Sequence, residues 1–367
     1  MLRRRVSAFA LACLIVVVVW STPPLGASTD TLPDRLTDQA FWTLSEQLSE
    51  PDGYFRSDNL LSNELYFPEI LDGLVERVPP GGVYLGVGPE QNFSYISAVN
   101  PRMVFITDVR RGNLHLQLMY KALFELSTDR AEFVSRLFTK PRPVQLTRDS
   151  PIRDIMDAYW SIDTNARATF DGNVKAVQDH LTKARALPLS ADDLAGIADV
   201  YGAFYWFGPS IAYNSSSSGG AGRANMANYY QLMLTTDTRG VVRSFLASDS
   251  SFRAIKDLHA RNLIVPVVGD FGGPRALRAI GAWVRERGAS VSMFYVSNVE
   301  QYLRQQGTES AFCASVASMP LVAGSTFVRS QSGGAGFRNL LGDMITETAS
   351  CVDRPAGIVP GAAGQSR

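Results

Sequence analysis

The fold is decided by Val83-Tyr84-Leu85-Gly86-Val87-Gly88-Pro89-Glu90-Gln91-Asn92, which is followed by Met103-Val104-Phe105-Ile106-Thr107-Asp108. Each part reads as a short apolar strand; the first breaks into a glycine turn and the second ends in a carboxylate. Glycine lets the backbone turn tightly and approach a ligand closely, because it has no Cβ. The pattern predicts two parallel strands of an α/β sheet, with the glycine turn and Asp108 on the same edge.

An acidic residue at the tip of the second strand can accept hydrogen bonds from ribose hydroxyls, as in Rossmann-type sheets. The two segments resemble class I S-adenosylmethionine-dependent methyltransferases, whose first strand ends in Gly-x-Gly and whose second ends in Asp or Glu. More closely, the run from Tyr84 to Asn92 with Asp108-Val109-Arg110-Arg111 is similar to a group of uncharacterised exported bacterial proteins with this methyltransferase-like core. Tyr84 stands where the usual first-strand acid would be, and Glu90 replaces the usual third glycine.

The resemblance implies a Rossmann-like, doubly wound, mostly parallel sheet that binds S-adenosylmethionine. Gly86 and Gly88 would then approach the methionine moiety, and Asp108 would hold the ribose. The cofactor-binding residues that the resemblance implies are Gly86, Gly88, Glu90, Asn92, Asp108 and Gly269. A plain strand–turn–helix corner, with Asp108 capping the next helix, is the structural alternative.

A third apolar run, Asn262 to Val268, ends in Gly269 and Asp270. Ligands bind at the carboxyl ends of strands in open α/β sheets, so we expect Asp270 on the same rim as Gly86 and Asp108. Methyl transfer is a direct displacement, in which the protein aligns a nucleophile and removes its proton. Asp270 is the candidate base, assisted by Tyr213 or Glu64.

Composition narrows the class of protein. The 367 residues are 46% hydrophobic and 19% charged, and Lys plus Arg equals Asp plus Glu at 35 each. A globular chain without a net positive field is a poor nucleic-acid partner, so we expect a small-molecule ligand and no nucleic acid.

The N-terminus is expected to direct export. Arg3-Arg4-Arg5, the apolar run Ala8 to Trp20 and the small residues ending near Ala27 are typical of a secretory signal peptide. We therefore expect a periplasmic or secreted protein without stable membrane insertion after leader cleavage. An uncleaved anchor is the alternative and would still leave the globular part outside.

Cysteine and histidine give little evidence of catalysis. After leader removal Cys313 and Cys351 remain, either as one disulfide or as two buried thiols. The three histidines, at positions 115, 180 and 259, lack metal-ligand spacing, so no metal site is expected.

The periodicity divides the chain into segments. The expected order is a signal peptide (1–27), a helical N-terminal arm (28–80), the first part of the sheet domain (81–139), a mostly helical insertion or cap (140–260), the second part of the sheet domain (261–350) and a disordered tail (351–367). Apolar periodicity predicts one long helix over 113–138, and Ser297 or Asn298 is expected to cap the helix that begins at Val299. Aromatic residues 201–213 beside a Ser/Gly-rich loop suggest either a substrate lid or a surface loop.

Three functions fit these observations. The first is methyl transfer from S-adenosylmethionine to an unknown acceptor. The second is a non-catalytic exported scaffold or small-molecule-binding protein, which the loss of the first-strand acid and of the third glycine favours. The cytoplasmic location of S-adenosylmethionine argues against the first. The third is a metal-assisted hydrolase that uses the strand-end carboxylates.

Overall fold

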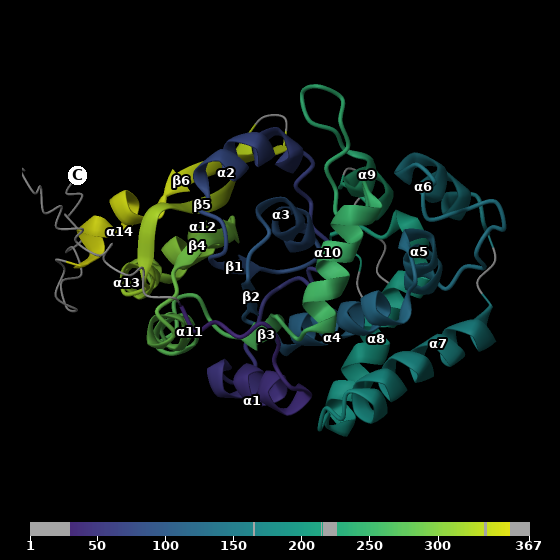
Figure 1. The fold of residues 1–367 in the computed structure, drawn as a ribbon, viewed down its shortest axis with the longest axis horizontal. Helices are drawn as coiled ribbons and strands as arrows, with labels where there is room; N and C mark the ends of the chain where they lie inside the picture. Colours follow the sequence, from purple (N-terminus) through teal and green to yellow (C-terminus); the bar gives the residue numbers. More distant parts are fainter. Residues whose placement is uncertain (1–29, 164–165, 214, 216–225, 334–335, 353–367) are drawn as a thin grey trace, which may run out of the picture.

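The computed structural model describes residues 30–163, 166–213, 215, 226–333 and 336–352. Its centre is one six-stranded sheet in the order β3-β2-β1-β4-β5-β6 (Figure 1). Only β6 runs antiparallel to its neighbour; the other four strand pairs are parallel. The strands are β1 (Val83–Val87), β2 (Met103–Asp108), β3 (Ile264–Val268), β4 (Val291–Ser297), β5 (Leu321–Gly333) and β6 (Gly336–Asp343). The predicted α/β class with a mostly parallel sheet is confirmed.

Helices cover both faces of the sheet, which follows from the alternation of side chains along each strand. On β4, Phe294 packs against Phe312 of α13 (Glu309–Ala317), with ring centroids 6.0 Å apart. The next residue, Tyr295, points to the opposite face, where its ring lies 4.9 Å from that of Tyr95 in α3 (Gln91–Val99). Both faces of the central strands are therefore buried, as their continuous apolar sequences predict.

The remaining helices lie around this sheet. Those nearest to the N-terminus are α1 (Asp38–Leu48), the 3-10 turn η1 (Phe67–Ile70) and α2 (Leu71–Arg77). The middle of the chain forms α4 (Arg111–Leu126), α5 (Arg130–Phe138), α6 (Ile152–Trp160), α7 (Arg167–Asp179), the π-helical turn η2 (His180–Ala184), α8 (Ala191–Phe207), the 3-10 turn η3 (Gly208–Ser210), α9 (Tyr229–Leu234) and α10 (Asp249–Ala260). The last part adds α11 (Ala276–Glu286), α12 (Val299–Gln306) and α14 (Met344–Val352).

Helix α1 closes the free edge of β3. Ser45 Oγ donates to the Pro266 carbonyl at 2.6 Å, and Ser49 Oγ accepts from Val268 N at 3.0 Å. The backbone N–H of Glu50 donates to the Val268 carbonyl at 2.7 Å. An edge strand with open hydrogen-bonding groups invites pairing with other chains, so α1 satisfies and hides this edge.

Segment 113–138 forms two helices, so the prediction of one long helix was wrong. Ser127 leaves the helical conformation, and the Asp129 side chain accepts from Glu132 N at 2.9 Å to cap the start of α5. Buried apolar residues lie on both sides of this break, at Leu123 and Phe124 in α4 and at Phe133 and Val134 in α5, so the apolar pattern alone does not show the cap.

The predicted helical insertion lies to the right of the sheet in Figure 1, as α6 to α9 beside α4 and α5. Within the described residues of segment 140–260 no strand forms, apart from two isolated bridges. Helix α10, at the end of this segment, packs against α3 and α4 and leads into β3. It therefore belongs to the layer that covers the sheet.

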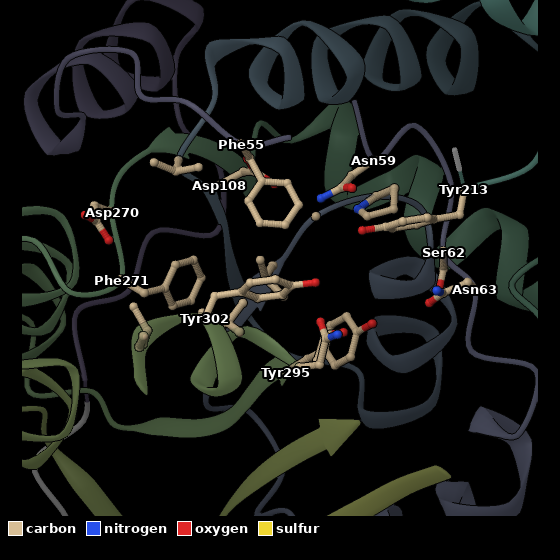
Figure 2. Close-up of a pocket in the computed structure, with 18 of the residues that line it drawn as sticks. Phe55, Asn59, Ser62, Asn63, Asp108, Tyr213, Asp270, Phe271, Tyr295 and Tyr302 are labelled. Carbon is tan, nitrogen blue, oxygen red and sulfur yellow. The ribbon is translucent and has the colours of Figure 1, made fainter. Parts of the chain in front are cut away.

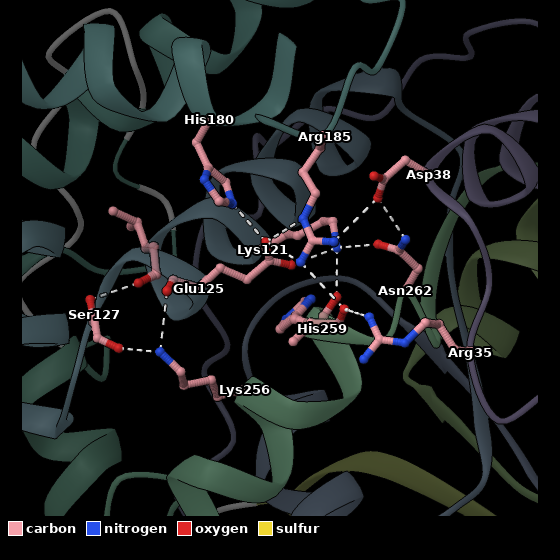
Figure 3. A network of polar contacts seen from close by, with 12 residues as sticks. Arg35, Asp38, Lys121, Glu125, Ser127, His180, Arg185, Lys256, His259 and Asn262 are labelled. Carbon is pink, nitrogen blue, oxygen red and sulfur yellow. Dashed lines mark hydrogen bonds and ion pairs between the residues drawn. The ribbon is translucent and has the colours of Figure 1, made fainter. Parts of the chain in front are cut away.

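A buried polar network joins the insertion to the sheet domain (Figure 3). Lys121 of α4 donates to Glu125 Oε1 at 2.7 Å and to Asn262 Oδ1 at 2.6 Å. His180 Nε2 and Arg185 Nε lie 2.6 and 2.7 Å from Glu125 Oε2. Burial acts to raise the pKa of Glu125, but these three neighbours outweigh it and hold the pKa at about 2. The carboxylate thus stays charged and fixes η2 on α4.

The C-terminal part carries one covalent link. Cys313 in α13 and Cys351 in α14 form a disulfide with a Cα–Cα distance of 5.8 Å. Residues 351 and 352 end α14, so the expected disordered tail does not begin at 351; residues 353–367 lie outside the described part. The predicted signal peptide also lies outside it. Among the helices that the structure describes, none has the length and apolar character needed to cross a membrane.

Candidate functional site

A cavity of about 300 Å³ lies at the carboxyl ends of β1 and β4 (Figure 2). The strand order reverses between these two strands, because β1 continues to β2 on one side and to β4 on the other. Helices leave the sheet in opposite directions at such a point, and the crevice between them is where open α/β sheets bind ligands. The volume is at the lower end of the range of small-molecule pockets.

Aromatic and acidic side chains dominate the walls. The aromatic lining residues are Tyr54, Phe55, Tyr213, Phe271, Tyr295 and Tyr302. The charged lining residues are Glu64, Asp108 and Asp270, and no basic side chain lines the cavity among the residues that the structure describes. Segments far apart in the chain thus meet here: the arm before β1, four strand ends, α12 and Tyr213 of the insertion.

Asp108 lies at the end of β2 and is 5% exposed. Its Oδ1 accepts from Arg110 N at 2.9 Å, which closes a local turn, and lies 3.4 Å from Arg110 Nε. Burial raises the pKa of Asp108 above its usual value, although the Arg110 charge and hydrogen bonds oppose the rise. Since the side chain also lines the cavity, it can accept hydrogen bonds from a ligand there.

Glu64 forms the polar floor of the cavity and is 1% exposed. Tyr295 donates to Glu64 Oε1 at 2.9 Å, Ser297 donates to the same oxygen, and Asn339 donates to Oε2. Burial raises the pKa of Glu64 above its usual value, and these hydrogen bonds limit the rise. No Lys, Arg or His forms an ion pair with Glu64 within the described part of the chain.

The prediction that Ser297 or Asn298 is the N-cap of α12 is confirmed for Asn298. The Asn298 side chain, however, makes no capping hydrogen bond. Ser297 has a φ of 49° and turns its hydroxyl to Glu64 instead. Both residues line the cavity, so this strand end contributes to the site.

Gly88 is the glycine of the turn that meets the cavity. Its φ of +75° is a left-handed conformation that glycine adopts without strain, and a Cβ there would meet no atom within 4 Å. Its carbonyl points inward and accepts from Asn113 Nδ2 and Gln117 Nε2, both at 3.0 Å. The turn is therefore fixed by hydrogen bonds on the side that faces the protein interior, and its other side is open to the cavity.

The Asn92 side chain fixes the same turn by hydrogen bonds from the protein interior and does not line the cavity. Its Nδ2 donates to the carbonyls of Val87 at 2.9 Å and Pro89 at 2.7 Å, and its Oδ1 accepts from Tyr84 OH at 2.8 Å. A Cβ at Gly86 would lie 1.8 Å from Asn92 Oδ1. Residue 86 must therefore be a glycine to leave room for the Asn92 side chain.

The structure brings the three residues named as catalytic to one cavity. Glu64, Tyr213 and Asp270 all line it, and Figure 2 shows Tyr213 and Asp270 at opposite ends. The Asp270 carboxylate accepts from Gly272 N at 2.9 Å. Burial raises the pKa of Tyr213 above its usual value.

Two further residues named for cofactor binding lie outside the cavity wall. A Cβ at Gly269 would lie 2.3 Å from Ala276 Cβ, so this glycine permits close packing of the start of α11. Glu90 is fully buried and accepts from Ser62 N at 3.2 Å; burial raises its pKa to about 8. Of the six residues named for the cofactor, only Gly88 and Asp108 line the cavity.

Sequence reasoning missed most of the aromatic wall. Phe55 and Tyr302 pack edge to face with ring centroids 5.1 Å apart, and Tyr295 carries the hydroxyl that bonds Glu64. Tyr295 could have been inferred, since it lies two residues before the end of a buried strand. Within the described residues, no cluster of three or more His, Cys, Asp or Glu side chains is arranged to hold a metal.

Residues 55–190 and 210–344 match a family described as a domain of unknown function, DUF7790. The match covers most of the chain, so this protein belongs to that family. It includes all six strands and every cavity-lining residue except Gly53 and Tyr54. A comparison with curated proteins gives no match.

Proposed function

We propose that this protein binds a nucleoside-type ligand of the S-adenosylmethionine class in the cavity between β1 and β4. The observation that carries the proposal is that Asp108, at the end of β2, lines the same cavity as the open side of Gly88, at the end of β1. This pair is the arrangement by which doubly wound sheets hold a ribose and the group attached to it.

The strand order supports a Rossmann-like fold for the proposal. The order β3-β2-β1-β4-β5-β6 is the order of doubly wound dinucleotide-binding sheets, with the difference that β6 here is antiparallel. The resemblance to class I methyltransferases, drawn from the turn and Asp108, agrees with this order. The departures at Tyr84 and Glu90 do not obstruct the cavity, because both side chains are buried behind it.

The residues present fit such a ligand. Asp108 would accept hydrogen bonds from ribose hydroxyls, and the open side of Gly88 admits a ligand close to the backbone. The rings of Phe55 and Tyr302 offer faces for a base. When bound, S-adenosylmethionine supplies an electrophilic methyl group. Glu64, with its raised pKa and buried position, is suited to take the proton of an acceptor.

We also propose that the protein acts outside the cytoplasm. The signal-peptide pattern in residues 1–27 supports export, and the Cys313–Cys351 disulfide fits an oxidising compartment. A non-catalytic exported binding protein is the second candidate. This second candidate is favoured because Arg110 already contacts one carboxylate oxygen of Asp108, which leaves that oxygen less available to a ligand.

The test is calorimetric titration with S-adenosylmethionine and S-adenosylhomocysteine. We expect micromolar binding that Asp108→Asn weakens by about 10- to 100-fold, because hydrogen bonds to a charged carboxylate contribute about 1.5–3 kcal/mol. Asparagine keeps the oxygen that closes the Arg110 turn, so the fold should survive. Asp192→Asn, at an exposed carboxylate outside the cavity, is the matched control. Equal affinity in wild type and Asp108→Asn, or no binding, would overturn the proposal.

A turnover measurement separates the two candidates. An enzyme should release S-adenosylhomocysteine from S-adenosylmethionine when supplied with candidate acceptors, and Glu64→Gln should slow that release without preventing binding. A binding protein should bind the ligand and give no product with any acceptor.

A further inference from the structure

The charged side chains that line the cavity in the described part of the chain are all acidic. Glu64, Asp108 and Asp270 line it, and no basic side chain does so in the described part of the chain. Asp108 has a counter-charge in Arg110, at 3.4 Å. Among the described residues, the partners of the Glu64 carboxyl are neutral donors: Tyr295, Ser297, Asn339 and Ser330. A buried carboxyl without a counter-ion favours a positively charged ligand group beside it.

The aromatic side chains point to the same chemistry. In Figure 2 the rings of Phe55, Tyr213, Tyr295 and Tyr302 surround one open space. The hydroxyls of Tyr295 and Tyr302 are engaged, the first with Glu64 and the second with Arg56 Nη2 at 3.2 Å. The Arg56 guanidinium carbon lies 5.5 Å from the centre of the Tyr302 ring, and Tyr95 packs against the Tyr295 ring at 4.9 Å, so each ring has one side left to meet a ligand. Ring faces attract cations, including quaternary ammonium groups.

We propose that this cavity selects an organic cation, a sulfonium or methylated ammonium group, held between Glu64 and the rings of Tyr213, Tyr295 and Tyr302, and that it rejects phosphate. The inference rests on the proposed function only in placing the ligand in this cavity; it does not require a nucleoside. Phosphate groups are excluded because the wall offers them carboxylates in place of basic side chains.

The experiment compares charged ligands with uncharged ligands of similar shape. Choline and its uncharged carbon isostere 3,3-dimethyl-1-butanol form one pair, S-adenosylmethionine and S-adenosylhomocysteine form another, and adenosine monophosphate is the anionic probe. We expect each cation to bind at least about fivefold more tightly than its uncharged partner, and adenosine monophosphate not to bind.

Glu64→Gln should abolish this preference, because glutamine keeps an oxygen that accepts from Tyr295 but removes the charge. Tyr302→Leu is the second variant; it removes one ring, leaves the Glu64 contacts intact and should reduce the preference. Asp192→Asn is the control and should leave it unchanged.

The outcomes separate this inference from the nucleoside proposal. Preference for choline over its isostere without nucleoside binding would support the cation site and overturn the nucleoside proposal. Equal binding of sulfonium and thioether nucleosides, with no choline preference, would do the reverse. Binding of adenosine monophosphate, an unchanged preference in Glu64→Gln, or no binding of any probe would overturn the cation site.

Discussion

The hydrogen bonds of the Asn92 side chain to the glycine turn predict a loss of folding stability whose size can be estimated. Asn92 and Tyr84 are fully buried, and each is the partner of the other through the 2.8 Å bond from Tyr84 OH to Asn92 Oδ1. In Asn92→Ala, Tyr84 OH and the carbonyls of Val87 and Pro89 lose their side-chain partner. The Pro89 carbonyl keeps the backbone N–H of residue 92 at 3.4 Å, and the Gly88 carbonyl keeps Asn113 and Gln117. Two buried groups left unpaired, at about 1–2 kcal/mol each, predict a loss of about 3 kcal/mol.

A double-mutant cycle tests the mechanism. Tyr84→Phe alone should cost about 1 kcal/mol, and the double variant should lose at least about 1 kcal/mol less than the sum of the single losses, because the orphaned hydroxyl is gone. Tyr159→Phe is the matched control, since its buried hydroxyl bonds the Ala131 carbonyl in another part of the fold. Its effect should add to that of Asn92→Ala.

The assay is urea unfolding followed by tryptophan fluorescence, with free energies from linear extrapolation. The reasoning is refuted if Asn92→Ala loses less than about 1 kcal/mol, or if the Tyr84 and Tyr159 cycles show the same coupling. Either result would mean that the turn is held by other contacts.

Three further predictions concern stability. Burial lowers the pKa of His259 to about 3. Below about pH 6.5 the unfolded chain therefore binds a proton at this residue, whereas the folded protein does not. The free energy of unfolding should fall by about 2 kcal/mol between pH 7 and 5. His259→Phe, in a site stacked on Phe124, should remove that part of the pH dependence; an unchanged slope in urea unfolding would contradict it. Removing the Cys313–Cys351 disulfide, whose cysteines are 38 residues apart, should cost about 4 kcal/mol, and a loss below about 1 kcal/mol in urea unfolding would contradict the estimate. Glu125→Gln should lose about 3 kcal/mol at pH 7, because it leaves buried cations without their carboxylate, and an unchanged unfolding midpoint would count against this role.

The strands of the parallel sheet could be predicted because buried strands read as short apolar runs ending in glycine or a carboxylate. Met103 to Asp108 matches β2 residue for residue. The hairpin partner β6 and helix α14 were missed, because Gly336–Asp343 is polar and glycine-rich and gains its pairing only from β5. Such edge elements depend on contacts that a local pattern does not contain.

The site was predicted less well than the sheet. The rim position of Asp108 follows from strand ends alone, which any parallel sheet places on one edge. The roles of the three glycines named for the cofactor were harder to predict. Gly86 and Gly269 leave space for Asn92 and Ala276, and of these three only Gly88 lines the cavity. The same residue type serves packing or ligand access, and only the tertiary neighbours decide between them.

The most direct test of the central claim is a crystal structure of the protein with S-adenosylhomocysteine. We predict ligand density in the cavity between β1 and β4, with the ribose hydroxyls against Asp108 and the base beside Phe55 or Tyr302. An empty cavity at millimolar ligand, or ligand bound elsewhere on the chain, would contradict the account.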